Sequence, residues 1–342
     1  MGVVGALYYC DGAQYSCYTH DMSIAARRLL RSGWRPAFPG DQPRGLMYYG
    51  CSLGSQETID NFETRVGFTA GVYREYYQAT QVNTMVSNVQ AWHAKNRLPI
   101  VSIKAPIVGT IDQNWQAVAN GSQDAWLNSI ASGLGALTKP VWFCIHHEPR
   151  GDGTQANYRA MYSHAIPILH QAKNLAVMPI LNGYSFDIND PASGWVTGLE
   201  DIVGVDYYNQ WWTYDTNISV NLDGAADNHR PWKTVDTNFN DVITEVDSWG
   251  KRVVFAEHGC HYAWNEPGKA AAWIDASYDY CLSRGVLAMS YFNSAANSPR
   301  GSWDLEQYTV IPPTNTTNYV PNNERYLAFQ ANTQKPGNAH IA

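Results

Sequence analysis

Residues Trp142 to Pro149 read WFCIHHEP. The apolar run Val141 to Ile145 predicts a short buried strand, which two histidines and Glu148 follow directly. The stretch Arg252 to Gly259 reads RVVFAEHG and repeats this design, because an apolar strand leads into Glu257. Cleavage of a glycosidic bond needs two such carboxyl groups, one protonated and one ionised.

Outward from these two stretches, the spacing of the apolar residues predicts strands that alternate with helices. The predicted strands are Gly45–Ser52, Phe68–Tyr77, Leu98–Pro106, Pro140–Ile145, Leu175–Leu181, Asp201–Asn209, Arg252–Ala256 and Val286–Asn293. The predicted helices are Thr58–Val66, Val82–Asn96, Gln123–Leu137 and the amphipathic stretches Tyr158–Leu169, Phe239–Trp249 and Ala270–Cys281. Eight apolar strands and their helices over about 250 residues predict a (β/α)8 TIM barrel. The rival doubly wound sheet lacks a glycine-rich phosphate motif after its first strand.

The chain divides into three parts on composition. Residues 1–43 form an N-terminal appendage, with a helix favoured over Ser23–Arg31 and a Gly/Pro-rich connector over Gly33–Pro43. Residues 44–296 form the barrel. Residues 297–342 contain the string PPTNTTNYVPNN and predict an extended C-terminal arm, lying on this domain or on a neighbour.

Composition excludes several classes of protein. The net charge of −7 argues against nucleic acid as the main partner. No run approaches the roughly 18 apolar residues of a membrane helix, and the N-terminus does not resemble a signal peptide. The 13 Trp and 22 Tyr are compatible with flat platforms under sugar rings. The six cysteines form no CxxC pair, so buried free thiols are expected, with a Cys10–Cys17 bridge left open.

The barrel gives these acids a common location. Side chains at the carboxyl ends of barrel strands converge on one open face, so Glu148 and Glu257 are predicted to face each other. A separation of about 5–5.5 Å implies retention of configuration and roughly 6.5–9.5 Å implies inversion. We expect the retaining mechanism, with Glu148 as general acid/base and Glu257 as nucleophile. Tyr208, near the end of the sixth strand, is the expected hydrogen-bond donor to Glu257.

These motifs resemble glycoside hydrolase clan A, and within it family 26. The matching strings are His147-Glu148, the sixth strand VGVDYYN, the seventh strand VVFAEHG and the eighth strand ending YFNS. The resemblance covers roughly residues 44–296 and implies a retaining barrel enzyme for β-mannan or related β-glycans. One departure is that Pro149 and Arg150 follow Glu148, where the family commonly has Met-Asn or similar. The departure leaves the substrate open.

The overall character of the chain, with its two flanking arms, resembles the minor tail proteins of phages that infect actinobacteria. This resemblance implies a virion location, other tail subunits as partners and a cell-envelope polysaccharide as target. Without that context the chain is expected to be cytoplasmic.

Further residues are candidates for binding or orienting a sugar, and each has an ordinary structural alternative. His147 would orient Glu148 or a sugar hydroxyl, whereas His146 should point the other way by strand alternation. Asp206 is expected to support the barrel rather than to act chemically. The remaining candidates are Lys104, Trp211, Trp212, Tyr262, Trp264 and Asn293. The alternatives for them are ion pairing and aromatic packing against the barrel.

Other chemistries are disfavoured. His258, Cys260 and His261 fit no common zinc spacing, and the chain has neither HExxH nor a GxSxG nucleophile elbow. We therefore expect no metal and no cofactor. Three functions stay open: a retaining endo-glycosidase, a non-catalytic glycan-binding or structural tail subunit on the same barrel, and an ordinary intracellular glycosidase.

Overall fold

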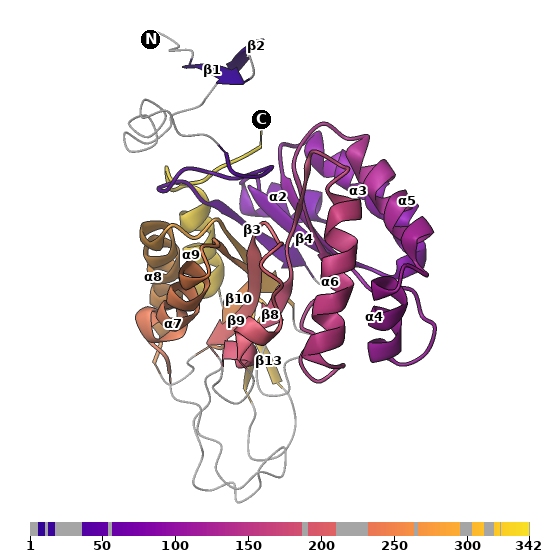
Figure 1. Ribbon diagram of the computed structural model, residues 1–342. Helices are drawn as coiled ribbons and strands as arrows, with labels where there is room; N and C mark the ends of the chain where they lie inside the picture. Colours follow the sequence, from indigo (N-terminus) through magenta and orange to yellow (C-terminus); the bar gives the residue numbers. More distant parts are fainter. Residues whose placement is uncertain are drawn as a thin grey trace, which may run out of the picture.

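The chain folds into a closed (β/α)8 barrel (Figure 1). The computed structural model describes residues 6–10, 13–17, 36–53, 57–186, 191–209, 232–262, 266–294, 303–310, 318–321 and 323–341. The barrel strands, all parallel, are β3 (Tyr48–Leu53), β4 (Val72–Tyr77), β5 (Leu98–Ile103), β6 (Val141–Ile145), β7 (Leu175–Val177), β8 (Ile180–Asn182), β9 (Val203–Asn209), β10 (Val253–Cys260) and β11 (Ala288–Asn293).

The barrel closes through its fifth strand, which is split into β7 and β8. β7 pairs with β6, and β8 pairs with β9 on the other side. Between them, the Met178 amide donates to Phe143 and the Pro179 carbonyl accepts from Gly204, at 2.8 and 2.9 Å. Pro179 has no amide hydrogen, so the ladder is interrupted there while the chain continues in the same direction. The predicted strand Leu175–Leu181 is therefore one barrel strand in two parts.

Helices cover the outside of the barrel (Figure 1). They are α2 (Ile59–Val66), α3 (Val82–His93), α4 (Ile111–Ala119), α5 (Asp124–Gly135), α6 (Gln155–Leu169), α7 (Val235–Ser248), α8 (Lys269–Arg284) and α9 (Glu324–Thr333). Four of them begin at a threonine whose hydroxyl accepts a backbone N–H of the first turn: Thr58, Thr110, Thr154 and Thr234. All the predicted helices of the barrel are present, and α4 is an addition that the sequence did not predict.

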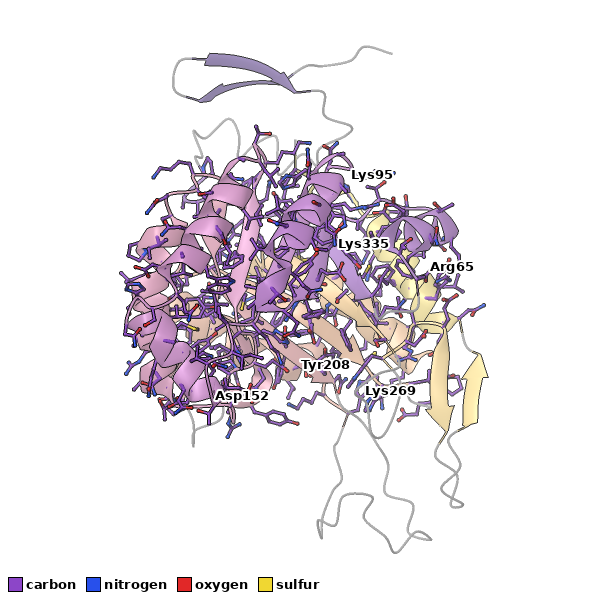
Figure 2. The ribbon with its side chains drawn as sticks, turned by 90° about the vertical axis from the view of Figure 1, so that its right-hand side faces the viewer. Arg65, Lys95, Asp152, Tyr208, Lys269 and Lys335 are labelled. Atoms are coloured by element: carbon purple, nitrogen blue, oxygen red, sulfur yellow. The ribbon has the colours of Figure 1, made fainter. Side chains whose placement is uncertain are left out.

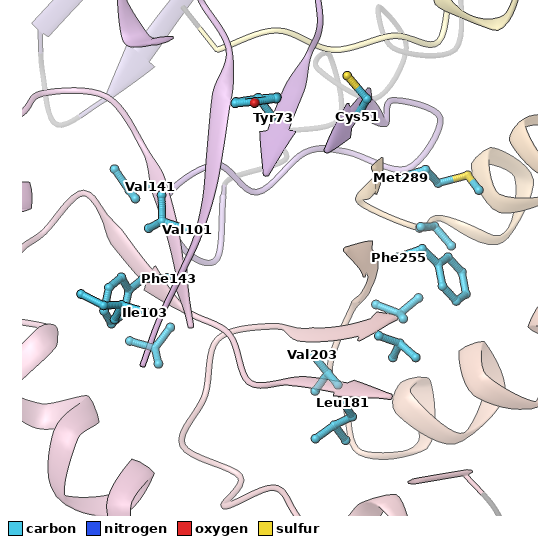
Figure 3. Close-up of a cluster of buried hydrophobic side chains, with 14 of the residues drawn as sticks. Cys51, Tyr73, Val101, Ile103, Val141, Phe143, Leu181, Val203, Phe255 and Met289 are labelled. Carbon is cyan, nitrogen blue, oxygen red and sulfur yellow. The ribbon is translucent and has the colours of Figure 1, made fainter. Parts of the chain in front are cut away.

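Apolar side chains form two layers. Those that point into the barrel, such as Trp142, Val254 and Ala256, pack with each other and with Ile341. Those that point outward, such as Phe143 and Phe255, pack against the helices, and Figure 3 shows them on strands all around the sheet. This alternation assigns each strand residue to the barrel interior or to the helix layer.

The prediction of an extended C-terminal arm is wrong for part of this region, which contains a helix. Residues 324–333 form α9, which packs against α8 and the barrel, with Phe329 in contact with Tyr49, Phe62 and Phe68. The chain then crosses the amino end of the barrel, where Ala339 donates to the Met47 carbonyl at 2.9 Å. The helix was missed because it buries Arg325 and Asn332 and exposes Leu327, so its apolar periodicity is weak.

Other segments lie outside the barrel sheet. β1 (Ala6–Cys10) and β2 (Ala13–Cys17) form an antiparallel pair, and β12 (Gln307–Val310) pairs with β13 (Asn318–Pro321). The side chains of Cys10 and Cys17 are not among those that the structure describes, so the bridge between them stays untested. Cys51, Cys144, Cys260 and Cys281 are buried free thiols, as predicted. The helix favoured over Ser23–Arg31 lies outside the described residues.

No helix among the described residues has the length and apolar character needed to cross a bilayer.

Candidate active site

A β-bulge in β10 aims Glu257 into the barrel. Phe255 pairs with Val205 and Glu257 pairs with Asp206, so Ala256 is an extra residue on β10. Strict alternation would place Ala256 inside and Glu257 outside, against the helices. The extra residue turns both side chains to the interior, which is the known effect of a bulge next to a functional site.

Three donors surround the Glu257 carboxylate. The Tyr76 hydroxyl donates to Oε1 and the Tyr208 hydroxyl donates to Oε2. The Arg74 guanidinium lies 3.3 Å from Oε1. Glu257 is only 7% exposed, and these three groups supply the polar contacts that its buried carboxylate needs. The predicted hydrogen bond from Tyr208 is present, and Tyr76 adds a second phenol that the sequence did not suggest.

Arg74 is fixed by Asp206 on the opposite side of the barrel interior. Its guanidinium forms a two-pronged contact with the Asp206 carboxylate, through Nη1 to Oδ1 and through Nη2 to Oδ2 at 3.1 Å. Both side chains are completely buried. A buried arginine is tolerated only with such a partner, so Asp206 supports the site as predicted.

The turn after β6 presents Glu148 by breaking the strand alternation. His146 and Glu148 both have left-handed backbone, with φ of 58° and 51°. The His146 ring points outward, against the Trp115 ring of α4 at 5.1 Å, as predicted for this histidine. The next residue, His147, reaches the Tyr76 ring at 5.2 Å and so faces the interior. The Glu148 amide donates to the Ile180 carbonyl at 2.8 Å, which holds the turn to β8.

The surroundings of Glu148 favour its protonated form. Burial raises the pKa of Glu148 to about 7, the negative charge of Glu257 adds to the rise, and Arg74 opposes it. Glu148 and Glu257 therefore lie within electrostatic reach of each other and of one arginine. The two glutamates therefore have different surroundings, because hydrogen-bond donors surround Glu257 whereas burial dominates at Glu148.

His147 is neutral. Burial, together with the positive charge of Arg74, lowers the pKa of His147 to about 2. Lys104, exposed at the end of β5, contributes to this shift and thus lies at the same end of the barrel. Figure 2 shows Tyr208 and Asp152 toward that end, away from Lys95.

Of the remaining predicted binding residues, the structure describes two, Asn293 and Tyr262. The Asn293 side-chain oxygen accepts the Leu305 amide at 2.8 Å, so this atom holds the chain after β11. Tyr262 is half-buried and packs against the layer between barrel and helices. Trp211, Trp212 and Trp264 lie outside the described residues.

Several residues of the site were missed from the sequence. Arg74 and Tyr76 come from β4, and an arginine within the aromatic strand VYREYY was the signal that could have revealed them. Trp303 lies between the rings of Tyr208 and His261, with centroids at 4.4 and 4.1 Å. It carried no signal, because it follows β11 by ten residues in a stretch that predicted no element.

No metal site emerges from the geometry. No group of three or more His, Cys, Asp or Glu side chains with metal-binding proximity occurs in the described part of the chain. His258, one of the three residues considered for zinc, is buried between Tyr49 and Tyr291. Burial lowers the pKa of His258 to about 3.

The fold was compared with solved structures. The catalytic domain of the family 26 endo-β-1,4-mannanase of Bacillus sp. JAMB-750 matches with a TM-score of 0.56 and 16% identity, covering 86% of this chain and 87% of that one. The two proteins share the (β/α)8 barrel fold. An endo-β-1,4-mannanase of Cellulomonas fimi matches with a TM-score of 0.55 and 16% identity, over 94% of this chain and 76% of the other.

A third match broadens the comparison beyond family 26. Cel5A of Thermotoga maritima, in complex with mannotriose, gives a TM-score of 0.55 at 11% identity, over 84% of this chain and 98% of the other. No protein-family model and no curated protein matches the chain. At these identities the comparisons establish the fold, and the chemistry has to be argued from the site itself.

Proposed function

We propose that this protein is a retaining endo-glycosidase that acts on a β-linked polysaccharide. The observation that carries the proposal is the different surroundings of the two strand-end carboxyl groups. Glu257 accepts hydrogen bonds from Tyr76 and Tyr208 and lies beside Arg74. Glu148 is buried, and burial raises its pKa to about 7.

In the first step, the Glu257 carboxylate attacks the anomeric carbon. Glu148 gives its proton to the glycosidic oxygen as the bond from carbon to that oxygen breaks. The products are a free sugar chain end and a glycosyl ester on Glu257. Arg74 and Asp206 keep the carboxylate in position, because their two-pronged contact leaves the guanidinium little freedom.

In the second step, the Glu148 carboxylate removes a proton from water. The resulting hydroxide equivalent attacks the same carbon, and the ester to Glu257 breaks. Two inversions at one carbon leave the configuration unchanged. Neutral His147, beside Tyr76, is placed to exchange a hydrogen bond with a sugar hydroxyl.

The solved neighbours suggest the first substrates to assay. They include two endo-β-1,4-mannanases, a Cel5A protein in complex with cellopentaose and a family 5 xyloglucanase in complex with a ligand. Half-exposed Tyr184, after β8, is placed to supply a flat platform for a sugar ring at the same end of the barrel.

The test is hydrolysis of β-mannan, β-glucan, xyloglucan and cell-envelope polysaccharides, followed by new reducing ends. Glu257→Gln is expected to lower kcat by at least about 10³-fold while sugar affinity changes little. Proton NMR of the first product should show the β-anomer before mutarotation. Full activity of Glu257→Gln would remove it as the nucleophile, and an initial α-anomer would contradict retention.

The finer proposal is that the barrel belongs to a phage tail and acts on a host-envelope glycan. It rests on the resemblance in overall character to minor tail proteins and on no shared motif. Antibody labelling of purified virions tests it. The non-catalytic alternative predicts that the wild-type protein binds these polysaccharides and releases no reducing ends.

A further inference from the structure

We propose that Asp152 is a positioning residue for Glu148, on which it acts through His146 and the turn between β6 and α6. The inference rests on the proposed function, in which Glu148 is the proton donor. Asp152 lies four residues after Glu148, and its Oδ2 accepts a hydrogen bond from Nε2 of His146 at 2.7 Å. Neither residue belongs to the two-carboxylate mechanism itself.

The turn from His146 to Glu148 needs stabilising contacts, because two of its residues have a left-handed backbone conformation. A left-handed conformation costs a residue with a side chain roughly 1–2 kcal/mol, and His146 and Glu148 both adopt it within three residues. Such conformations persist where the surroundings over-determine them. If His146 returned to ordinary strand geometry, its ring would turn inward and the direction of Glu148 would change with it.

Two contacts hold the His146 ring and a third holds its backbone. Asp152 accepts its Nε2–H, the Trp115 ring packs edge-on against it, and the Tyr158 hydroxyl donates to the His146 carbonyl at 3.0 Å. Gly153, the neighbour of Asp152, packs so closely on Trp115 that a Cβ would lie 2.5 Å from the indole. The turn is therefore a packed unit of α4, α6 and the residues between them.

Asp152 also acts on Glu148 through its charge. The groups that face Glu148 are Glu257 from β10, Arg74 from β4 and Asp152 from the turn. The neighbouring His146 and His147 are neutral because burial lowers the pKa of both, and Lys104 from β5 adds to that effect. Glu257 and Asp152 both favour the protonated form of Glu148, and Arg74 alone opposes them.

Two variants separate the positioning effect of Asp152 from the effect of its charge. Asp152→Asn keeps an acceptor for His146 and removes the charge, whereas Asp152→Ala removes both. In Asp152→Asn we expect the alkaline limb of kcat/KM to move to lower pH by roughly half a unit to one unit, with kcat at the optimum nearly unchanged. In Asp152→Ala we expect the same displacement and a loss of roughly 10- to 100-fold in kcat.

The chain offers a matched control on its outer surface. Asp124 accepts from Nε2 of His164 at 2.6 Å, and its side chain is 46% exposed against 41% for Asp152. Asp124→Asn should leave both limbs of the profile in place. Because Asp152 is partly exposed, the displacement in Asp152→Asn should shrink as salt is added.

A readout that needs no turnover keeps the inference separate from the proposed function. The side-chain carboxyl of Glu148 is titrated by ¹³C NMR, with Glu148→Gln identifying its signal. A lower midpoint in Asp152→Asn supports the inference even if the wild type releases no sugar. The absence of sugar release would contradict only the proposed function. The inference is overturned if kcat in Asp152→Ala is no lower than in Asp152→Asn or, for a wild type that releases no sugar, if the midpoint is unchanged in both Asp152 variants. A lower thermal stability of Asp152→Ala would not rescue it.

Discussion

Glu148 and Glu257 carry the same side chain at the ends of two barrel strands, yet their surroundings differ. Glu257 receives two phenol hydrogen bonds and lies 3.3 Å from a guanidinium. Glu148 has burial and the charge of Glu257 as the leading causes of its raised pKa. Placing both acids at strand ends follows from the sequence, but the roles depend on these neighbours.

The pH dependence of hydrolysis should reflect this difference. In the proposed mechanism, the first step requires a protonated Glu148. Because the pKa of Glu148 is raised to about 7, kcat/KM should fall as the pH rises through about 7. A full pH profile of the wild type measures this limb, and a plateau extending to pH 9 would contradict Glu148 as the acid.

Loss of a phenol donor to Glu257 should lower the rate of hydrolysis. Tyr76→Phe removes the hydrogen bond to Glu257 Oε1 and Tyr208→Phe removes that to Oε2. Because each hydrogen bond positions the carboxylate that attacks in the proposed mechanism, kcat should fall roughly 10- to 100-fold in each variant. Tyr280→Phe, which removes a phenol hydrogen bond to Asp236 between the outer helices α7 and α8, is the control and should keep the kcat of the wild type.

At the scale of the elements, the runs of apolar residues predicted the strands. The site lies where the alternation of side chains along two of these strands is interrupted. The extra residue Ala256 in β10 and the left-handed residue His146 after β6 each reverse the side-chain alternation. Without these breaks Glu257 would face the helices. A bulge has no signature in the string VVFAEHG, because it depends on how β9 and β11 pair with β10.

The buried ion pair between β4 and β9 should be costly to break. Asp206→Ala leaves Arg74 buried without its main partner, so we expect a loss of about 3–5 kcal/mol in the free energy of unfolding. Urea denaturation followed by circular dichroism measures it. Asp279→Ala removes an exposed pair with Lys335 and should cost less than about 1 kcal/mol; equal losses in the two variants would contradict the assignment.

At the scale of the whole molecule, segments far apart in sequence complete the barrel. The last helix, α9, packs on α8 and against β3, and the chain after it crosses the amino end of the barrel beside Met47 (Figure 1). Trp303, also beyond β11, packs on Tyr208 behind Glu257. The C-terminal region is thus part of the barrel and of its site.

A substitution in α9 tests whether the barrel depends on it. Phe329→Ala removes a fully buried ring that contacts Tyr49 and Phe62, so we expect a loss of roughly 3–5 kcal/mol in the free energy of unfolding. Leu327→Ala, on the exposed side of the same helix at 57% exposure, should change stability by less than about 0.5 kcal/mol. An unchanged free energy of unfolding in Phe329→Ala would show that the barrel does not depend on the packing of α9.

The sequence by itself determined the eight apolar strands, most of their helices and the two acids at the ends of β6 and β10. It could do so because strand burial and helix amphipathicity are local patterns in the chain. The tertiary structure alone decided that Arg74 and Tyr76 reach Glu257, that Asp152 holds His146, and that α9 packs against α8 and β3. These depend on strand register, bulges and packing between distant segments, and no local pattern of residues encodes them.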